Sequence, residues 1–211
     1  PITEAVDAFR FMAAGKHIGK NVLDFDVPEI EIGQPTEEGH RFRSDGTYLI
    51  TGGAGGFGLE LAEWMSENGA RHFALMSRSG PKEDAPEKIE KLEAAGVSIM
   101  DARGDVTSRA DIDRIVADIQ KTDAPLIGVI HGAMVLDDEF LIELDPARFD
   151  RVLLPKMLGA WNLHEATLDI PLEHFISFSS FSAVIGAVKQ ANYNAGNVFL
   201  DQILRTAQSL L

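Results

Sequence analysis

From residue 46 onward, strand-like and helix-like patterns of hydrophobic residues alternate along the chain. Short apolar runs that suit buried strands are separated by stretches in which apolar residues return every three or four positions, as on one helical face. The expected strands cover residues 47–51, 72–77, 97–102, 126–131 and 174–179. The expected helices cover residues 57–69, 85–95, 108–121, 146–167 and 191–208. Such alternation predicts an α/β fold with a parallel sheet, helices on both faces and right-handed crossovers.

The first 45 residues follow a different pattern. Residues 3–14 place apolar side chains on one helical face, and residues 20–25 are expected to form a short strand. The apolar helix positions are Ala5, Ala8, Phe9 and Met12. A stretch rich in proline, glycine and charge then predicts a linker or irregular surface segment. We therefore expect three parts: residues 1–26, a linker over 27–45, and one main domain over 46–211.

A glycine-rich turn directly follows the first strand expected in that domain. Residues 51–58 read TGGAGGFG, and Gly53, Gly55 and Gly58 fill the pattern GxGxxG at the start of a helix. One such glycine permits the tight turn, one lets the backbone approach a pyrophosphate, and one allows close packing of helix on strand. The candidate cofactor-binding residues are Gly52, Gly53, Ala54, Gly55, Gly56, Phe57 and Gly58. The order strand, glycine turn, helix predicts a Rossmann-type, doubly wound sheet, with an ordinary glycine turn as the alternative.

Composition and charge narrow the classes of function. The chain is 45% hydrophobic with 25% charged residues, and no apolar run approaches the ~20 residues of a membrane helix. We therefore expect a cytoplasmic protein without a membrane partner. The net charge of -14 also argues against a nucleic-acid partner, because binding along a nucleic-acid backbone depends on clustered Lys and Arg. There is no cysteine, and the six histidines lack metal-ligand spacing. Disulfides, thiolate chemistry and a metal site are therefore not expected.

The ends of the next three strands carry further cofactor candidates. Ser77 and Arg78 end the second strand, where a guanidinium suits the 2′-phosphate of NADP and an acidic residue would suit NAD. The third and fourth strands end near a second group of candidates, because ligands of open α/β sheets bind at carboxyl strand ends. That group is Asp105, Val106, His131, Gly132 and Ala133. A solvated role for Arg78 and a helix N-cap role for Asp105 are the alternatives.

The last third of the chain carries the reactive groups. The fifth strand ends in Ser179 and Ser180, while Tyr193 and Asn197 lie four residues apart on the following helix and share a face. A hydroxyl, a phenol and an amide are thus expected beside a bound nicotinamide. Reduction of a carbonyl needs a hydride, a donor for the developing oxyanion and an acid. Tyr193 suits the acid if an ammonium group lies near enough to lower the pKa of its phenol.

The source of that ammonium identifies the family that the chain resembles. Short-chain dehydrogenases commonly place a lysine four residues after the tyrosine, where this chain has Asn197, whereas Lys156 lies on the preceding expected helix. This exchange of lysine and asparagine resembles the ketoreductase domains of polyketide synthases and related fatty acid synthases. The resemblance runs over residues 46–211, through TYLITGGAGGFG, ALMSRSG, VIHGAMVLDD, LLPKMLGAWNLHEAT, FSSFSAVIG and KQANYNAGNVFLD.

The resemblance implies a role for each group. Tyr193 would donate the proton, Ser180 would orient the carbonyl, and Lys156 and Asn197 would position the proton relay and the cofactor ribose. Ser180 is preferred over its neighbours because the family serine stands thirteen residues before the tyrosine. The family reduces a β-ketoacyl thioester, held on an acyl carrier protein, with NADPH to a β-hydroxyacyl thioester. The alternatives are a core tyrosine, a surface lysine and a strand-end serine cap.

A short acidic motif bears on the stereochemistry of that product. Leu136, Asp137 and Asp138 resemble the fingerprint of the B-type, which gives the D-configured (3R) alcohol. Ile185 stands where the opposite type has a tryptophan, in agreement with the B-type. A solvated acidic loop is the alternative.

The chain differs from a complete ketoreductase domain at both ends and at two positions within it. Residues 1–25 resemble the C-terminal end of an enoylreductase domain, which suggests excision from a larger synthase. Met134 and Lys189 stand where the family has glycines. We expect that the sheet is truncated at its C-terminal end and that the ketoreductase's structural half is absent. The fragment alone should therefore bind cofactor weakly and reduce poorly.

Three functions remain open on the sequence alone. The first is NADPH-dependent reduction within a synthase, whose other domains would be partners. The second is a noncatalytic, ketoreductase-like scaffold, and the third is a nucleotide-sensing regulator built on a Rossmann fold. The complete set of serine, tyrosine, lysine and asparagine favours the first, because a regulator does not need it.

Overall fold

The computed structural model describes residues 2–15, 21–24, 42–81 and 85–208, with side chains described to residue 203. The chain divides into two compact units, Pro1–Gly39 and His40–Leu211. The second unit contains the described sheet and all the candidate site residues.

The first unit contains one short helix. The 3₁₀ turn η1 (Ile2–Glu4) leads into α1 (Ala5–Ala13), which confirms the helix expected over residues 3–14. The strand expected over 20–25 is wrong for residues 21–24, which form no strand; residues 20 and 25 lie outside the described part. A strand needs a neighbouring strand to complete its hydrogen bonds. Here the Ile2 N–H instead donates to the Asp24 carbonyl (2.8 Å), which joins residues 21–24 to the turn before α1.

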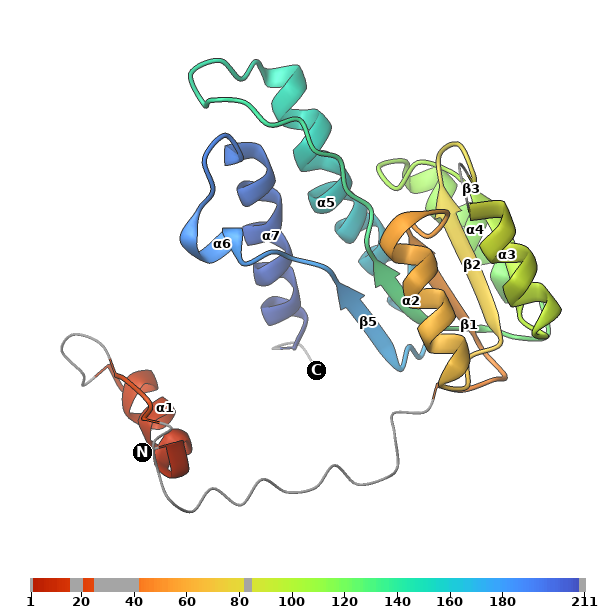
Figure 1. The fold of residues 1–211 in the computed structure, drawn as a ribbon, viewed down its shortest axis with the longest axis horizontal. Coiled ribbons are helices and arrows are strands. Elements are labelled where there is room, and N and C mark those ends of the chain that lie inside the picture. Colours follow the sequence, from red (N-terminus) through yellow and green to blue (C-terminus); the bar gives the residue numbers. More distant parts are fainter. Residues whose placement is uncertain (1, 16–20, 25–41, 82–84, 209–211) are drawn as a thin grey trace. The chain divides into compact units, whose positions relative to one another are not determined.

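Five parallel strands form the sheet of the second unit, in the order β3-β2-β1-β4-β5 (Figure 1). They are β1 (Thr47–Thr51), β2 (His72–Ser77), β3 (Ser98–Arg103), β4 (Leu126–His131) and β5 (His174–Ser177). Every residue of β1 and β4 is buried, as expected for central strands covered on both faces. The predicted α/β, Rossmann-type fold is therefore confirmed.

Helices cover both faces of the sheet. One face packs against α2 (Gly56–Glu67) and α3 (Ala85–Ala94), and the other packs against α4 (Arg109–Gln120) and α5 (Pro146–Ala166). Successive side chains of a strand point to opposite faces of the sheet. Tyr48 and Ile50 therefore pack in the hydrophobic core under α2 and α3, and Leu49 packs in the core under α4 and α5. The last helix, α7 (Ala191–Gln208), lies beside α5 (Figure 1).

Two differences from the expected elements occur near the end of the sheet. β5 ends at Ser177, two residues before the expected end, because its partner β4 ends at His131, opposite Ser177. Beyond that pair, one last bond joins the Phe178 N–H to the His131 carbonyl (3.0 Å). The short helix α6 (Ser182–Ile185) follows and was not expected, since four residues are too few to show a helical period.

The sheet unit begins before the glycine turn. Phe42 is buried, and its ring contacts those of Tyr48 and Trp64 edge to face, each at 5.5 Å between centroids. The Arg43 N–H donates to the Tyr48 hydroxyl (2.9 Å). Residues 42–45 of the expected linker thus pack on the sheet unit, and residues 27–41 lie outside the described part. The limits of the parts that precede the sheet domain stay predictions.

The sheet topology selects one place for a ligand. β1 lies between β2 and β4, so the strand order reverses at β1. The chain leaves β1 towards one face and leaves β4 towards the other, which opens a crevice above their carboxyl ends. The glycine turn and the ends of β4 and β5 all lie at this edge.

Candidate active site

The glycine turn is closed on one side and open on the other. A Cβ atom on Gly53 would lie 2.6 Å from the Ile50 carbonyl oxygen, and one on Gly58 would lie 2.5 Å from that of Gly52. Neither position has room for a side chain, because backbone atoms are in the way. A Cβ on Gly55, at the N-terminus of α2, would meet no atom within 4 Å. The turn therefore leaves space where the free N–H groups of α2 face an incoming anion.

Two adjoining hollows continue from this turn over the strand ends. The first has a volume of about 390 Å³ and the second of about 410 Å³. Both are lined by Thr51, Gly52 and Met134, so they form one cleft. The first hollow is also lined by Ser77, Arg78, Asp105, Val106 and Ala133, and the second by Gly55, Phe57, Gly58, Gly132, Lys156, Ser179 and Tyr193. The cleft thus joins cofactor candidates at one end to reactive groups at the other.

Arg78 is exposed at the first hollow. It makes no hydrogen bond or ion pair with another described residue, whereas the Ser77 hydroxyl accepts from the Gly80 N–H (2.9 Å). A planar cation of this kind suits a phosphate group through paired hydrogen bonds.

Asp105 shapes the loop after β3. Its Oδ1 accepts from the Thr107 N–H (2.9 Å) and hydroxyl (2.8 Å). The N-cap of α4 is Ser108, whose hydroxyl accepts from the Asp111 N–H (3.3 Å). The alternative that Asp105 caps this helix is therefore wrong, because three residues separate it from the first residue of α4.

The strand ends of β1 and β4 are joined by a buried threonine. The Thr51 hydroxyl oxygen accepts from the N–H groups of Gly132 (3.2 Å) and Ala133 (3.1 Å) and lies 2.8 Å from His131 Nδ1. The hydroxyl has one proton, so it donates that proton to His131 and fixes the tautomer with hydrogen on Nε2. Burial and the nearby charge of Lys156 lower the pKa of His131 to about 4. His131 is thus neutral and lies behind the cleft, with 1% exposed.

Lys156 and Tyr193 meet at the second hollow, although 36 residues separate them along the chain. Lys156 extends from α5, and its Nζ lies 5.1 Å from the centroid of the Tyr193 ring. The same Nζ donates to the Phe178 carbonyl (3.0 Å). Gly196 lets α7 approach the lysine stem, because a Cβ there would lie 3.2 Å from Lys156 Cβ and Cδ. Burial lowers the pKa of Lys156 to about 8.

The serine and asparagine candidates near this pair differ in their hydrogen-bond partners. Ser179 lines the second hollow, and its hydroxyl donates to the Asn197 carbonyl (3.3 Å). The Ser180 hydroxyl instead accepts from the N–H (3.2 Å) and the hydroxyl (3.0 Å) of Ser182. Asn197 is fully buried, and its amide donates to the Tyr193 carbonyl (3.0 Å). Its Oδ1 has no hydrogen-bond partner among the described residues, so a buried acceptor remains available beside the reactive pair.

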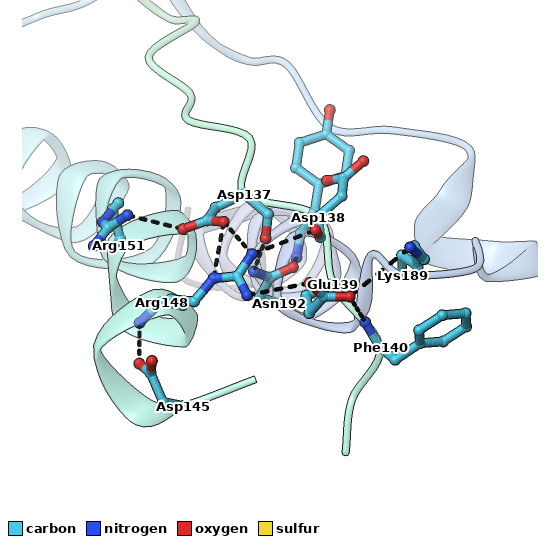
Figure 2. Close-up of polar contacts among 10 residues, drawn as sticks. Asp137, Asp138, Glu139, Phe140, Asp145, Arg148, Arg151, Lys189 and Asn192 are labelled. Carbon is cyan, nitrogen blue, oxygen red and sulfur yellow. Dashed lines mark hydrogen bonds and ion pairs between the residues drawn. The ribbon is translucent and has the colours of Figure 1, made fainter. Parts of the chain in front are cut away.

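The acidic motif is held by two arginines of α5 (Figure 2). Asp137 accepts from Arg148 Nε (3.0 Å) and Nη2 (2.5 Å), and from Arg151 Nη1 (2.9 Å). The hydrogen bonds from Arg148 lower the pKa of Asp137. Asp138 accepts from Gln190 Nε2 (2.9 Å). The alternative of a merely solvated acidic loop is wrong for Asp137, because only 17% of its side chain is exposed, whereas Asp138 is exposed.

The two family departures lie beside this motif. Met134 is half exposed in the wall shared by both hollows, and Leu136 is exposed to the same extent. Lys189 has φ 66°, a left-handed conformation that favours glycine. Its ammonium lies 3.8 Å from Glu139 and 4.5 Å from the centroid of the Phe140 ring. These contacts offset part of the backbone strain.

Several residues of the site were missed on the sequence. Thr51 and Asn162 are buried polar residues that join strand ends and loops; the Asn162 amide donates to the Val106 carbonyl (3.1 Å). Gly196 allows α7 to pack closely against Lys156, and Arg148 forms an ion pair with Asp137. The signal was a polar residue or glycine at an otherwise apolar position of a strand or helix, which indicates a packed contact but not the residue on the other side of it.

The described residues contain neither a membrane-spanning helix nor a cluster of metal ligands. No described helix is both long and apolar enough to cross a bilayer. No group of three or more acidic, histidine or cysteine side chains in the described part is arranged to hold a metal ion.

Comparisons with known proteins agree with this geometry. Residues 46–210 match the family described as the KR domain. The chain is 43% identical to a mycocerosic acid synthase-like polyketide synthase of Mycobacterium tuberculosis, over 100% of the chain and 10% of the relative. It is 39% identical to a highly reducing polyketide synthase of Fusarium sp, over 94% of the chain and 8% of the relative.

Solved structures show the same likeness. A ketoreductase domain from the bacillaene assembly line is 36% identical with a TM-score of 0.76, covering 80% of this chain and 40% of that one. An A1-type ketoreductase is 34% identical with a TM-score of 0.77, covering 87% of this chain and 38% of that one. The chain thus spans well under half of the solved structures it matches.

Proposed function

This chain belongs to the ketoreductase (KR) domain family of polyketide synthases, and from that premise we propose that it reduces a β-ketoacyl thioester to a β-hydroxyacyl thioester with NADPH. It does so as one domain of a multidomain synthase. The substrate is held on an acyl carrier protein, which with the other synthase domains is its partner. The single observation that carries the proposal is the lysine–tyrosine pair, with Lys156 Nζ 5.1 Å from the centroid of the Tyr193 ring in a cleft that begins at a glycine turn.

The residues of the cleft fit NADPH. The space at Gly55 and the N–H groups that begin α2 suit the pyrophosphate. Arg78, with no described partner of its own, suits the 2′-phosphate and favours NADPH over NADH. The Oδ1 of buried Asn197 has no hydrogen-bond partner among the described residues and would be the acceptor beside the reactive pair, although Asn197 does not itself line the second hollow. When bound, NADPH supplies the hydride.

The chain's own residues supply the proton and hold the carbonyl. The Lys156 ammonium, 5.1 Å from the centroid of the Tyr193 ring, would stabilise the negative charge that develops on the phenol oxygen as Tyr193 donates its proton. With a pKa of about 8, Lys156 is largely protonated at pH 7. The serine that orients the carbonyl oxygen is Ser180 by resemblance, while Ser179 is the serine that lines the hollow. The Ser180 hydroxyl accepts two hydrogen bonds and keeps its proton for the developing oxyanion, whereas the Ser179 hydroxyl would first have to give up its bond to the Asn197 carbonyl.

The experiment measures thioester-dependent NADPH oxidation by the synthase that contains this chain. Tyr193→Phe should lower the rate by roughly 10²–10⁴-fold, the usual contribution of a general acid. Tyr48→Phe is the matched control, because Tyr48 is the only other tyrosine and is buried in the core, outside the cleft. Its rate should stay within about twofold, and NADH should replace NADPH poorly.

The outcomes separate the candidate functions. Undiminished product reduction in Tyr193→Phe would indicate the noncatalytic scaffold. NADPH binding without any thioester reduction in the unmodified synthase would indicate the nucleotide-sensing regulator.

We also propose a B-type product, because Leu136, Asp137 and Asp138 carry the B-type motif. Chiral chromatography of the released β-hydroxy acid should show the D-configured (3R) alcohol in excess. An excess of the opposite alcohol would reject the assignment while leaving the reductase activity intact.

A further inference from the structure

An ion-pair cluster lies at the rim of the cleft, in the loop between β4 and α5 (Figure 2). At its centre, Asp137 receives three hydrogen bonds from Arg148 and Arg151, both on α5. The side chains of Asp137 and Arg148 are 17% and 27% exposed. Exposed ion pairs contribute little to stability. A partly buried carboxylate that accepts hydrogen bonds from two nitrogens of one guanidinium is, by contrast, held in a fixed position.

The same loop is joined on its other side to the start of α7. The Glu139 N–H donates to the Lys189 carbonyl (2.8 Å), and Glu139 and Gln190 form an isolated parallel bridge. The Glu139 carboxylate also receives a longer contact from Arg148 (3.4 Å). Residues 137–139 are therefore held between α5 and the segment that leads into α7.

One side chain connects the cluster directly to the reactive tyrosine. Asn192 is fully buried, and its Nδ2 donates to the Asp137 carbonyl oxygen (3.0 Å). Its Oδ1 accepts from the Tyr193 N–H (2.8 Å). Both ends of this amide are thus used, one on the acidic loop and one on the backbone of Tyr193.

The cluster also lies on the helix that carries the lysine. Arg148 and Arg151 are eight and five residues before Lys156 on α5. Arg151 in addition lines the first hollow of the cleft. Asp137 therefore links α5, which carries Lys156, to the start of α7, which carries Tyr193: its carboxylate pairs with the arginines of α5, and its backbone carbonyl accepts from Asn192.

We propose that Asp137 is a positioning residue, which acts through Arg148 and Asn192 to hold Tyr193 against Lys156. This rests on the proposed reductase function for its kinetic consequences. Asp137 does not need to touch the substrate, since its carboxylate is already taken by the two arginines. A small displacement of Tyr193 is costly, because misplacement by about 1 Å can slow a reaction 10²-fold.

The kinetic test replaces the two members of the pair in the synthase that contains this chain. Asp137→Ala and Arg148→Ala should each lower kcat by about 10- to 100-fold. The KM for NADPH should change less than threefold, because neither side chain binds the pyrophosphate. The double variant should be no slower than the slower single variant, as expected for residues that act as a unit. Arg148→Lys, which keeps the charge, should recover part of the rate.

The matched control is Arg109→Ala. Arg109 also pairs with two carboxylates, Asp113 (2.7 Å) and Glu165 (2.7 Å), but lies on α4 outside the lining of the cleft. Its loss should leave kcat within about twofold. An equal loss of kcat in the control would mean that the effect reflects general destabilisation, and would overturn the proposal.

A second measurement does not depend on turnover. Hydrogen exchange at the amides of Glu139 and Tyr193 should quicken at least tenfold in Asp137→Ala, and stay unchanged in Arg109→Ala. Unchanged exchange at both amides would overturn the positioning role, even in a synthase that reduces nothing. Quickened exchange in Asp137→Ala, together with no reductase activity in the unmodified synthase, would instead reject the proposed function alone. If Asp137→Ala does not fold, Asp137→Asn, which keeps the size of the side chain, gives the same two readouts.

Discussion

At the scale of single residues, the site depends on an ammonium group kept in an unfavourable place. Lys156 is 3% exposed, makes one hydrogen bond, to the Phe178 carbonyl, and has a pKa lowered to about 8 by burial. The charged form is thus disfavoured in the folded chain relative to water. A residue that weakens the fold is retained when its position serves the chemistry, which here is the contact with Tyr193.

Lys156→Met should therefore stabilise the fold while abolishing reduction. The pKa difference, from 10.5 to about 8, sets an upper limit of about 3 kcal/mol at pH 7. Solvent screening and the lost hydrogen bond reduce this, so we expect a gain of about 1–2 kcal/mol in the free energy of unfolding. Urea denaturation measures it.

The pH dependence of that gain identifies its cause. Between about pH 8 and pH 10.5 the unfolded chain binds more protons at Lys156 than the folded chain, so the stability of the unmodified chain rises with pH. The gain in Lys156→Met should be complete below about pH 8 and disappear towards pH 10.5. Lys91→Met, at an exposed lysine, should show no gain at either pH. A gain that persists unchanged to high pH would contradict this explanation.

The residues of the site were predictable to different degrees. The glycine turn and Tyr193 follow from spacing, and Lys156 followed from family resemblance. Arg148 and Asn192 could not be found in this way, because periodicity identifies helices but not which helices pack together. Their partners on the acidic loop depend on how α5 and α7 meet, which is a property of the folded chain.

At the scale of elements, the central strands were easy to predict and the edge was not. β1, β2 and β4 match their expected bounds because their apolar runs are buried on both faces. β5 pairs only with β4 within the described chain, and its end is set by where β4 stops. Local sequence does not contain that information, so the expected strand was too long.

The junction of β1 and α2 gives a paired prediction. Gly58→Ala should destabilise the fold by about 2 kcal/mol or more, because the new Cβ would lie 2.5 Å from a backbone oxygen. Gly55→Ala should leave the melting temperature nearly unchanged, because no atom lies within 4 Å of its Cβ. It should nevertheless weaken NADPH binding, because the methyl group takes the space meant for the pyrophosphate.

Thermal unfolding and NADPH fluorescence titration test the two glycines together. Equal loss of stability in both variants would show that the turn is tight throughout. Unchanged NADPH affinity in Gly55→Ala would place the pyrophosphate elsewhere in the cleft.

At the scale of the whole molecule, the folded sheet unit extends beyond the alternating pattern that predicted it. Phe42 lies outside the expected domain, yet it is 8% exposed and packs on Tyr48 and Trp64. A lone aromatic residue in a charged segment gives no periodic signal, so sequence patterning set the domain start at residue 46.

Two shortened chains test this start. A chain beginning at residue 40 should be more stable than one beginning at residue 46 by about 3–5 kcal/mol, the usual cost of losing a buried phenylalanine. Phe42→Ala in the complete chain should reproduce most of that difference. Equal denaturation midpoints for the two shortened chains would show that the Phe42 contacts contribute nothing.

The division of the reactive pair between α5 and α7 limits how such domains can be recombined. Lys156, Tyr193 and the residues that hold them come from α5, α7 and the loop before α5. The contacts that join these three parts span from 11 to 55 residues of the chain. A chimera whose crossover falls between residues 148 and 192 joins an arginine from one parent to an asparagine from the other. Exchange between homologues should therefore move residues 134–197 as a single block, with junctions in β4 or beyond the middle of α7.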